Sequence, residues 1–360
     1  MSRQPAPEAA AVLANGASCA APLTDIERVQ LGHGSGGKMS ARLLRERFLP
    51  HFRSDVLARL GDAAVVPVDT GEIAISTDTF VITPLEFPGG NIGSLAVHGT
   101  MNDLAMMGAV PRFLSAGFVL EEGLRLDLLD RVIQAMAGAA REAGVELVTG
   151  DTKVVDRGKA DGIFINTTGI GVVRSDFRPA PDRARAGDVV LVSGPVGRHG
   201  IAIMAAREDL GFATHLVSDS ANLFPLVEAL RVAAGPHVHT LRDPTRGGMA
   251  SALNEIAATA SLGIELEEHA LPVPADVYGA CELLGLDPLY VANEGIFVAF
   301  VAPERADAAL AAMRQHPIGA AAARIGRVVP EHPGMVILRT AIGGSRVVDM
   351  LPGDQLPRIC

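Results

Sequence analysis

The strongest constraint on the fold is an amphipathic segment, Leu126–Ala143, that lies between two apolar segments with strand character. Its apolar residues recur at helical spacing, and Gly144 follows directly, as expected of a residue that ends a helix. Residues 113–120 before it and residues 145–148 after it are apolar enough for strands, and we predict the second as short and buried. Because strands and helices bury their apolar faces against one another, this region predicts a mixed α and β domain.

The same mixture of strands and helices is predicted on both sides of a Pro- and Arg-rich stretch, residues 178–187. Further strands are predicted at residues 65–68, 72–76, 163–173, 188–192, 264–266, 296–301 and 335–339. Further helices are predicted after the capping residue Asn91 and at residues 200–208 and 249–260. We therefore predict an α/β (α+β) fold of two domains, residues 28–177 and 178–349.

The two ends of the sequence differ from these domains in composition. Residues 1–27 are rich in Ala and Pro and lack the features of a signal peptide, so we predict a disordered extension. Residues 350–360 contain Pro352, Gly353 and Pro357, which disfavour a helix. We predict that this segment is an extended, flexible tail that ends in Cys360.

Composition argues against several classes of function. The chain has 360 residues, a net charge of −10, no Trp and 2 Tyr, so a nucleic-acid-binding surface is not expected. No apolar run approaches the ~18–20 residues of a membrane helix, so we expect no membrane partner. The three cysteines, Cys19, Cys281 and Cys360, are far apart and odd in number. We expect reduced thiols, a cytoplasmic location and a core position for Cys281.

A glycine-rich loop near the start of the first domain is the first candidate for phosphate binding. Its sequence fits both G-x-x-x-x-G-K and G-x-G-x-x-G, but Met39 stands where a P-loop has Ser or Thr. Backbone N–H groups of consecutive glycines can approach phosphate oxygens, whereas a flexible surface loop is the alternative. The candidate contacts are Gly34, Gly36, Gly37 and Lys38.

Four carboxylates recur at strand ends, in glycine turns and on a helix: Asp62, Asp78, Asp103 and Asp151. Magnesium prefers carboxylate oxygens together with substrate phosphates, so the four could converge on one Mg-ATP site. Asp103 is the most informative, because Asn102 and Asp103 interrupt a largely apolar helix, and a buried carboxylate needs a partner such as a cation. Taken singly, each acid is more often a turn former or a helix cap.

Three further polar clusters are candidates for contact with an anion or a proton. Lys153 follows Asp151 after a predicted strand and could meet a terminal phosphate, or be a solvated lysine. The motif that begins at Arg242 carries two arginines before a helix, which suits an anion or an ordinary cap with surface arginines. Glu294, between apolar stretches, is a candidate base with a raised pKa, and a capped turn is the alternative.

Cys360 closes the chain at a place where no pattern would hold a structural thiol in a core. The tail spans up to ~36 Å when extended, which is long enough to place Cys360 first in a partner's site and then in the chain's own site. An exposed cysteine without a function is the alternative.

These features together resemble the HypE family, the carbamoyl dehydratases of nickel-iron hydrogenase maturation, from about Leu31 to Cys360. The carriers are HGSGGK (33–38), STDTFVITPLEFPGGNIG (76–93), NDLAMMGAVPR (102–112), VTGDTKVV (148–155), RDPTRGG (242–248), ANEG (292–295) and the terminal PRIC (357–360). The family lies in a wider ATP-using group with aminoimidazole ribonucleotide synthetase, whose metal-binding turn is similar to residues 61–64. The resemblance implies that group's two-domain fold, a homodimer whose N-terminal domains share a β-barrel, and ATP near the dimer interface.

The resemblance also implies a reaction and its partners. A HypF protein would load a carbamoyl group onto the Cys360 sulfur, and ATP-dependent dehydration would turn it into S-cyanocysteine, a thiocyanate. The cyano group would then pass to a HypC–HypD complex as the cyanide ligand of the hydrogenase iron.

Under this hypothesis each candidate residue has an expected role. Carboxylates would bind Mg²⁺, lysines would stabilise the transferring phosphoryl group, and Cys360 would carry the substrate. Glu294 is the first choice of base and His33 the second. The expected metal ligands are Asp62, Asp78, Asp103 and Asp151, and the expected lysines are Lys38 and Lys153. The remaining ATP contacts are expected at Gly34, Gly36, Gly37, Asn102, Thr149, Gly150, Arg242 and Asp243.

Two rival interpretations differ in what they leave unexplained. Selenophosphate synthetase, of the same group, usually carries Cys or selenocysteine in its glycine loop, where this chain has Ser35 and no Cys. Neither that enzyme nor thiamine-monophosphate kinase accounts for the terminal PRIC. The rival of another class is a nucleotide-gated scaffold whose tail docks on partners, which would show binding without turnover.

Overall fold

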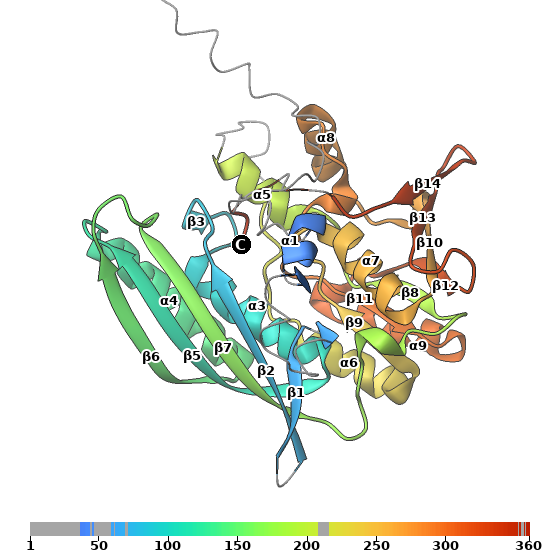
Figure 1. Cartoon of the computed structure of the whole chain (residues 1–360), viewed down its shortest axis with the longest axis horizontal. Coiled ribbons are helices and arrows are strands. Elements are labelled where there is room, and N and C mark those ends of the chain that lie inside the picture. Colours follow the sequence, from blue (N-terminus) through green and yellow to red (C-terminus); the bar gives the residue numbers. More distant parts are fainter. Residues whose placement is uncertain are drawn as a thin grey trace, which may run out of the picture.

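A computed structural model of the chain describes residues 37–43, 45–46, 59–60, 62–68, 71–207, 216–351, 353, 356 and 358–360. Three predicted site residues, His33, Gly34 and Gly36, lie outside the described residues, as does the predicted extension. The described part begins with the short helix α1 (Lys38–Leu43) and continues into two units, each built on its own sheet (Figure 1).

The first sheet has five strands in the order β1-β2-β7-β5-β6, and α3 and α4 cover one of its faces (Figure 1). β5 and β6 are parallel because α4 connects them, whereas the other neighbouring strands are antiparallel. The strands are β1 (Ala64–Val68), β2 (Gly71–Phe80), β5 (Ala109–Glu121), β6 (Glu146–Val155) and β7 (Ile163–Val173). A small hairpin, β3 (Glu86–Phe87) and β4 (Gly90–Asn91), precedes α3.

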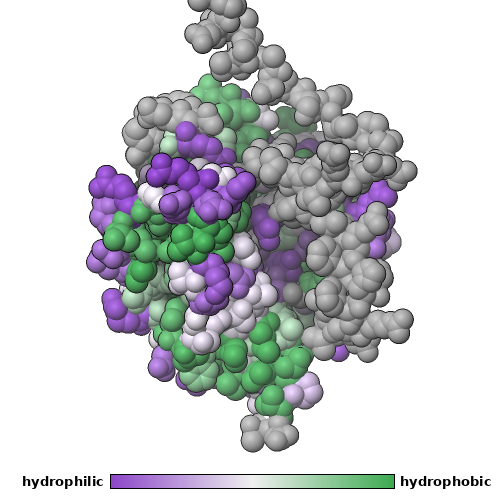
Figure 2. All heavy atoms as spheres, turned by 60° about the vertical axis from the view of Figure 1, so that its left-hand side comes forward, coloured by the Kyte–Doolittle hydropathy of each residue, from purple (hydrophilic) through white to green (hydrophobic). Residues whose placement is uncertain are grey.

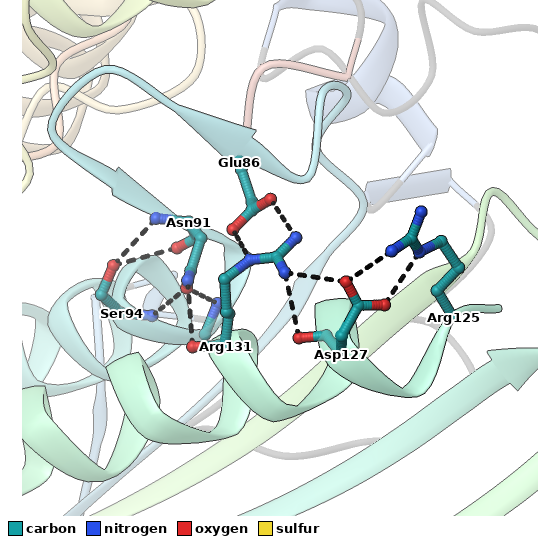
Figure 3. A network of polar contacts seen from close by, with 7 residues as sticks. Glu86, Asn91, Ser94, Arg125, Asp127 and Arg131 are labelled. Atoms are coloured by element: carbon teal, nitrogen blue, oxygen red, sulfur yellow. Dashed lines mark hydrogen bonds and ion pairs between the residues drawn. The ribbon is translucent and has the colours of Figure 1, made fainter.

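The helix α3 (Ile92–Met106) begins where its sequence provides a cap. Asn91 Oδ1 accepts hydrogen bonds from the N–H groups of Gly93 and Ser94 at 2.9 and 3.2 Å (Figure 3). Ser94 Oγ accepts from Asn91 N–H at 3.1 Å, which completes a capping box and confirms the predicted cap. Because α3 packs against the sheet, α4 and the second unit, it is buried on nearly all sides and carries Asp103 into the interior.

The helix α4 (Leu126–Ala143) has the predicted bounds, and Gly144 ends it with a φ of 67° as predicted. An exposed ion-pair network ties it to the β3–β4 hairpin (Figure 3). Arg131 donates to Glu86 through Nε and Nη2 at 2.8 Å and to Asp127 at 3.2 Å. Exposed pairs of this kind contribute little to stability, so the helix depends mainly on its apolar face.

Two strands of the first sheet are longer than predicted. β2 continues to Phe80, so Asp78 lies within the strand rather than after it. β6 was predicted to be short and buried, but it continues to residue 155 as an edge strand, with Leu147 44% and Val148 53% exposed. Residues 149–155 pair in parallel with β5, and this pairing outweighs the turn preference of Gly150.

The second sheet has seven strands in the order β14-β13-β10-β12-β8-β11-β9. Of the neighbouring pairs described in this second sheet, only β10–β13 is parallel. Its strands are β8 (Val189–Val192), β9 (Val238–Arg242), β10 (Gly263–Glu267), β11 (Val298–Val301), β12 (Ala323–Val329), β13 (Val336–Arg339) and β14 (Ser345–Val348). Its helices are α5 (Arg198–Arg207), α6 (Phe224–Ala234), α7 (Gly248–Ala260), α8 (Ala275–Leu284) and α9 (Pro303–Gln315). Short 3₁₀ turns lie at Pro181–Arg183, Gly235–His237, Glu268–Ala270, Pro288–Tyr290 and Pro317–Gly319. Two sheets with separate helices confirm the predicted two-domain α/β fold.

Neither sheet closes on itself over the described residues, since β1 and β6 are the edges of the first sheet and β14 and β9 are the edges of the second. One chain alone therefore does not form the β-barrel that was predicted between N-terminal domains. In the same part of the chain, no helix combines the length and hydropathy that a membrane span requires. Cys281 is 1% exposed on α8, which confirms its predicted position in the core.

Apolar side chains from both units share a core at their junction. Ile201 and Ile203 of α5 are buried together with residues of α3 and the first sheet. Leu356 and Ile359 of the tail are 8% and 3% exposed and belong to the same core. The described part of the tail is thus docked between the two units, and Figure 1 shows the C-terminus between α5, β3 and α1.

Candidate nucleotide and carrier site

Three carboxylates from distant parts of the sequence come together between the two units. Asp62 precedes β1, Asp103 lies on α3, and Asp243 directly follows β9. One ligand oxygen from each lies within 4.8 Å of the others. Like charges at this spacing repel one another unless protons or cations intervene, so the cluster is suited to hold a cation.

β2 supplies a fourth acid to this cluster. Ser76 and Asp78 lie two residues apart and point to the same face of the sheet. Ser76 Oγ donates to Asp103 Oδ2 at 2.5 Å. Asp78 lies close enough to Asp103 that repulsion from Asp78 raises the pKa of Asp103 further. Three of the four predicted metal ligands, Asp62, Asp78 and Asp103, are therefore neighbours.

The cluster has the electrostatics of a cation site. Burial raises the pKa of Asp62 and the pKa of Asp103 well above their usual values, and burial raises the pKa of Asp243 to about 6. Asp62 Oδ2 is buried and has no hydrogen-bond partner among the described residues. An orphaned carboxylate oxygen beside further acids fits a divalent cation that takes oxygen ligands, such as Mg²⁺.

Arg242, which was predicted to contact an anion, is held between two carboxylates instead. Its Nη1 lies 2.6 Å from Asp62 Oδ1, and its Nη2 lies 2.6 Å from Glu255 Oε2. Glu255 lies near the arginine because α7, which carries Glu255, begins just beyond the end of β9. The guanidinium therefore offsets part of the negative charge of the cluster and does not present its positive charge to a phosphate.

Glu294 is 2% exposed, and its Oε1 has no hydrogen-bond partner within the described ranges. Burial raises the pKa of Glu294 well above its usual value, and repulsion from Asp243, Asp219 and Asp78 raises it further. This confirms the raised pKa that was predicted for a polar residue between apolar stretches. A carboxylate of this kind can accept a proton nearer neutral pH than an exposed one can.

Asp219 is a neighbour of Glu294 that no sequence pattern indicated. Its Oδ1 accepts from Glu294 N–H at 3.1 Å, and burial raises the pKa of Asp219 to about 6. A Cβ atom added at Gly295 would lie 1.6 Å from Asp219 O, so only glycine allows the two segments to approach this closely. The glycine of the Asn-Glu-Gly triplet therefore meets a packing requirement beside the acid that precedes it.

Asn102 was predicted to contact ATP, but its polar atoms are used by the backbone of the second unit. Its Nδ2 donates to Ala221 O at 3.0 Å and to Glu294 O at 3.4 Å. Its Oδ1 accepts from Leu223 N–H at 2.9 Å, and the residue is 1% exposed. Asn102 therefore fixes α3 against the segments that carry the acids of the site.

The last residues of the chain enter this site. Val81 N–H donates to Cys360 O at 3.1 Å, and Thr83 N–H donates to Arg358 O at 3.3 Å. Val81 follows Asp78 by three residues along extended chain, which corresponds to roughly 10 Å. The tail thus lies beside the end of β2, within reach of the acidic cluster.

A cavity of about 60 Å³ lies between the tail, α1 and the start of α7. Ser251 of α7 lines it with a hydroxyl that is buried and has no hydrogen-bond partner in the described part of the chain. The cavity is lined by Gly37, Val81, Arg246, Gly247, Ser251, Tyr290, Ala292, Leu351, Gly353, Leu356, Arg358, Ile359 and Cys360. Cys360 therefore borders a small space with mixed polar and apolar walls.

Arg246 connects this cavity to the acids. Attraction to Cys360 is the largest influence on the pKa of Arg246 and raises it, and attraction to Asp78 and Glu294 raises it further, while burial opposes the rise. Both arginines of the RDPTRGG motif were noted in the sequence, but only Arg242 was predicted as an ATP contact. Arg246 is the one that lies near the tail, because the turn after β9 directs it toward Cys360.

The described end of the glycine-rich loop contacts the tail. Gly37 is buried and lines the cavity, while Lys38 N–H donates to Leu351 O at 2.9 Å. The Lys38 ammonium forms an ion pair with Asp349. Lys38 is therefore engaged by the start of the tail in this state rather than by the acidic cluster.

The segment Thr149, Gly150, Asp151 and Lys153 lies away from the cluster within one chain. Its strand, β6, is three positions from β2 in the sheet, which separates the two strands by roughly 14 Å. Asp151 and Lys153 are 69% and 70% exposed in their side chains and pair with each other at 2.6 Å. Asp243, rather than Asp151, lies beside Asp62 and Asp103.

Comparison with known proteins agrees with this architecture. Residues 60–173 match the AIR synthase related protein, N-terminal domain, and residues 185–338 match the corresponding C-terminal domain. Carbamoyl dehydratase HypE of Bradyrhizobium diazoefficiens is 54% identical over 332 residues, which cover 92% of this chain and 96% of that protein. Carbamoyl dehydratase HypE of Escherichia coli is 48% identical over 340 residues, which cover 93% of this chain and 100% of that protein.

Solved structures give the same result. A HypE–HypF complex matches with a TM-score of 0.82 and 45% identity over 86% of this chain and 99% of that chain. HypE in complex with ATP matches with a TM-score of 0.78 and 52% identity over 91% of this chain and 98% of that chain. Thiamine monophosphate kinase of Aquifex aeolicus matches with a TM-score of 0.61 at 20% identity over 84% of this chain and 97% of that chain, which shows a shared fold alone.

Proposed function

The chain belongs to the HypE family of carbamoyl dehydratases, and we propose that it converts a carbamoyl group carried on its own Cys360 into a cyano group with the consumption of ATP. The product is S-cyanocysteine, a thiocyanate that supplies the cyanide ligand of a nickel-iron hydrogenase. The observation that carries this proposal is the position of Cys360. It borders a cavity that Arg246 also lines, and Arg246 is attracted to the acids of the cluster as well as to Cys360.

The chemistry needs the carbamoyl oxygen to become a better leaving group. That oxygen attacks the terminal phosphorus of ATP, ADP leaves, and the nitrogen loses one proton, which gives an O-phosphorylated intermediate with a C=N bond. The C–O bond then breaks, phosphate departs with the bonding electrons, and the nitrogen loses its second proton, which gives C≡N. We propose that Arg246 stabilises the negative charge that develops on the transferring group.

We assign Mg²⁺ to the acidic cluster, with Asp62, Asp78, Asp103 and Asp243 as the residues that hold it. A bound ion would offset the charge of the triphosphate. The proposal rests on the close approach of three of these acids and on the unpartnered oxygen of Asp62 among the described residues. Asp243 replaces Asp151 in the set that was predicted from the sequence.

Glu294 is proposed as the base that removes the protons from nitrogen. Its Oε1 is buried and unpartnered over the described residues, and burial raises its pKa, so it has the proton affinity that the step requires. Attraction to Arg246 opposes that rise. His33, the second choice, lies outside the described residues.

We propose that the chain is a homodimer in which two first sheets form a shared β-barrel. The strands of this sheet expose large apolar side chains, and Figure 2 shows apolar groups on the side of the molecule where the sheet lies. These side chains are Phe113, Leu147, Val148, Val154 and Val172. Exposed apolar area of this extent marks an interface. In such a dimer β6 faces the second copy, and Lys153 and Asp151 would reach a nucleotide bound there.

Loading and unloading of Cys360 require partners. A solved HypE structure contains HypF, and we propose that a HypF protein carbamoylates Cys360 of this chain. We further propose that a HypC–HypD complex accepts the cyano group. Both transfers need the tail to leave the docked position, because Cys360 is partly covered there.

Two substitutions test the proposed function. Cys360→Ala should abolish formation of the cyano product and leave ATP affinity unchanged, because the residue carries substrate and does not bind nucleotide. Asp103→Asn should weaken Mg-dependent ATP binding by about tenfold or more. Hydrogenase maturation by Cys360→Ala would overturn the carrier role, and an unchanged nucleotide titration of Asp103→Asn would remove that residue from the site.

A further inference from the structure

The end of the tail is held through its backbone. Val81 pairs with Cys360, and Thr83 pairs with Arg358, so the two segments run antiparallel in the manner of an added strand. Recognition of this kind depends on carbonyl and N–H groups rather than on the cysteine side chain. A substituent on the sulfur therefore leaves these backbone contacts in place.

Helix α5 supplies two side chains that bind tail carbonyls. Arg207 Nη2 donates to Arg358 O at 2.8 Å and also to Thr83 O at 2.8 Å, and Arg207 Nε donates to Thr83 O at 3.1 Å. The guanidinium thus bridges the tail and the strand end that the tail pairs with. A charged donor with two fixed acceptors gives hydrogen bonds stronger than neutral ones.

His199, two turns earlier on α5, binds the next carbonyl. Its Nε2 lies 2.7 Å from Ile359 O, and its Nδ1 lies 2.7 Å from Ser218 Oγ. Because a carbonyl oxygen only accepts, Nε2 carries the hydrogen, and Nδ1 accepts from the hydroxyl when the ring is neutral. The ring is fully buried and packs edge-on against Phe87 with 5.7 Å between centroids, so its orientation is fixed.

The backbone conformation of Arg358 indicates that these contacts hold the tail against strain. Arg358 has a φ of 58°, which is unfavourable for a residue with a side chain. Its side chain is bound in turn, with Nη2 donating to Thr83 Oγ1 at 2.7 Å and an ion pair to Asp161. A strained residue persists only where its surroundings determine it, so loss of the contacts should release the tail.

We propose that Arg207 and His199 are positioning residues that set how far Cys360 enters the site, by binding the carbonyl groups of residues 358 and 359. The role of Cys360 as carrier rests on the proposed function, but the docking itself does not. Because both residues bind backbone, the tail docks in the same register whether the sulfur is unmodified, carbamoylated or cyanated. Arg358 and Asp161 complete the hold from the other side of the tail.

The test is the rate at which iodoacetamide alkylates Cys360, followed by peptide mass in full-length chain without ATP. A Cys19→Ser background removes the cysteine that lies outside the described residues, and Cys281 is buried. Arg207→Ala should raise the alkylation rate about tenfold or more, since it removes charged hydrogen bonds to the tail. Arg207→Lys keeps the charge but not the planar fork, so its alkylation rate should lie between the rates of wild type and Arg207→Ala.

A matched control and a second variant keep the test decisive. Arg131→Ala removes an ion-paired arginine of α4, away from the tail, and should leave the alkylation rate unchanged. Asp161→Asn alters a half-exposed residue, where a substitution changes the stability of the fold little, and it should raise the rate several-fold.

Unchanged alkylation of Cys360 in both Arg207→Ala and Asp161→Asn would overturn the positioning role. Faster alkylation in these variants, in a protein whose wild type forms no cyano product, would support the docking contacts while rejecting the proposed reaction. The two failures are therefore distinguishable.

Discussion

The guanidinium of Arg242 lies 2.6 Å from a carboxylate oxygen of Asp62, and this contact joins the second unit to an acid of the first. The other oxygen of Asp62 has no protein partner over the described residues. One half of the carboxylate is therefore satisfied within the chain, and the other half is left for a ligand. The contact between the two units and the charge balance of the site therefore depend on the same pair of residues.

Removal of that arginine should destabilise the fold strongly. Arg242→Ala leaves Asp62 and Glu255 without their buried cation, which should lower the free energy of unfolding by roughly 3–5 kcal/mol. Urea unfolding measures the loss. Arg324→Ala is the control, because Arg324 pairs with an Asp307 side chain that is 94% exposed, and the change should stay below about 1 kcal/mol. Equal losses in the two variants would show that the inter-unit pair has no special role.

Glu294→Gln should separate binding from turnover. The amide keeps the shape of the side chain but takes up no proton, so the rate of dehydration should fall by about 10²–10⁴-fold while ATP affinity is unchanged. Because burial raises the pKa of Glu294, the wild-type rate should increase with pH as the carboxylate loses its proton. Single-turnover rates at several pH values test both points. A variant within a few-fold of wild type would assign the base elsewhere.

His199 should make stability depend on pH in a known direction. Burial lowers its pKa to about 4, whereas an unfolded histidine has a pKa of about 6.5. The unfolded chain therefore binds more protons in this window, and the stability contributed by neutral His199 is lost as the pH falls from about 6.5 toward 4. The stability advantage of wild type over His199→Gln should shrink by about 2 kcal/mol between pH 7 and pH 5. Urea unfolding at both pH values measures it, and a pH-independent difference would contradict the burial of a neutral ring.

Local signals in the sequence were sufficient where an element's ends are set by its own residues. The bounds of α4 follow from its apolar spacing and from Gly144, and the start of α3 follows from the cap at Asn91. β6 was misjudged because its length is set by pairing with β5, which no window of its own sequence records. β9 ends at Arg242 and was not predicted as a strand, since its short segment becomes a strand only beside β11.

The candidate site was predicted in part, for a similar reason. A carboxylate on an apolar helix requires a compensating partner wherever the helix packs, so the sequence alone was enough to identify Asp103. The choice between Arg242 and Arg246 depends on the direction of the turn after β9, and the docking of Cys360 depends on strand-end groups at Val81. Those relationships are tertiary, and sequence spacing does not contain them.

The central claim is that Cys360 carries the group that ATP dehydrates. Intact-protein mass measures this directly: the chain is carbamoylated, and its mass is recorded before and after addition of Mg-ATP. The account predicts that the modified chain loses the mass of one water molecule and that peptide mapping places the loss at Cys360. A carbamoylated chain that binds ATP and keeps its mass would contradict the account and favour a nucleotide-gated scaffold.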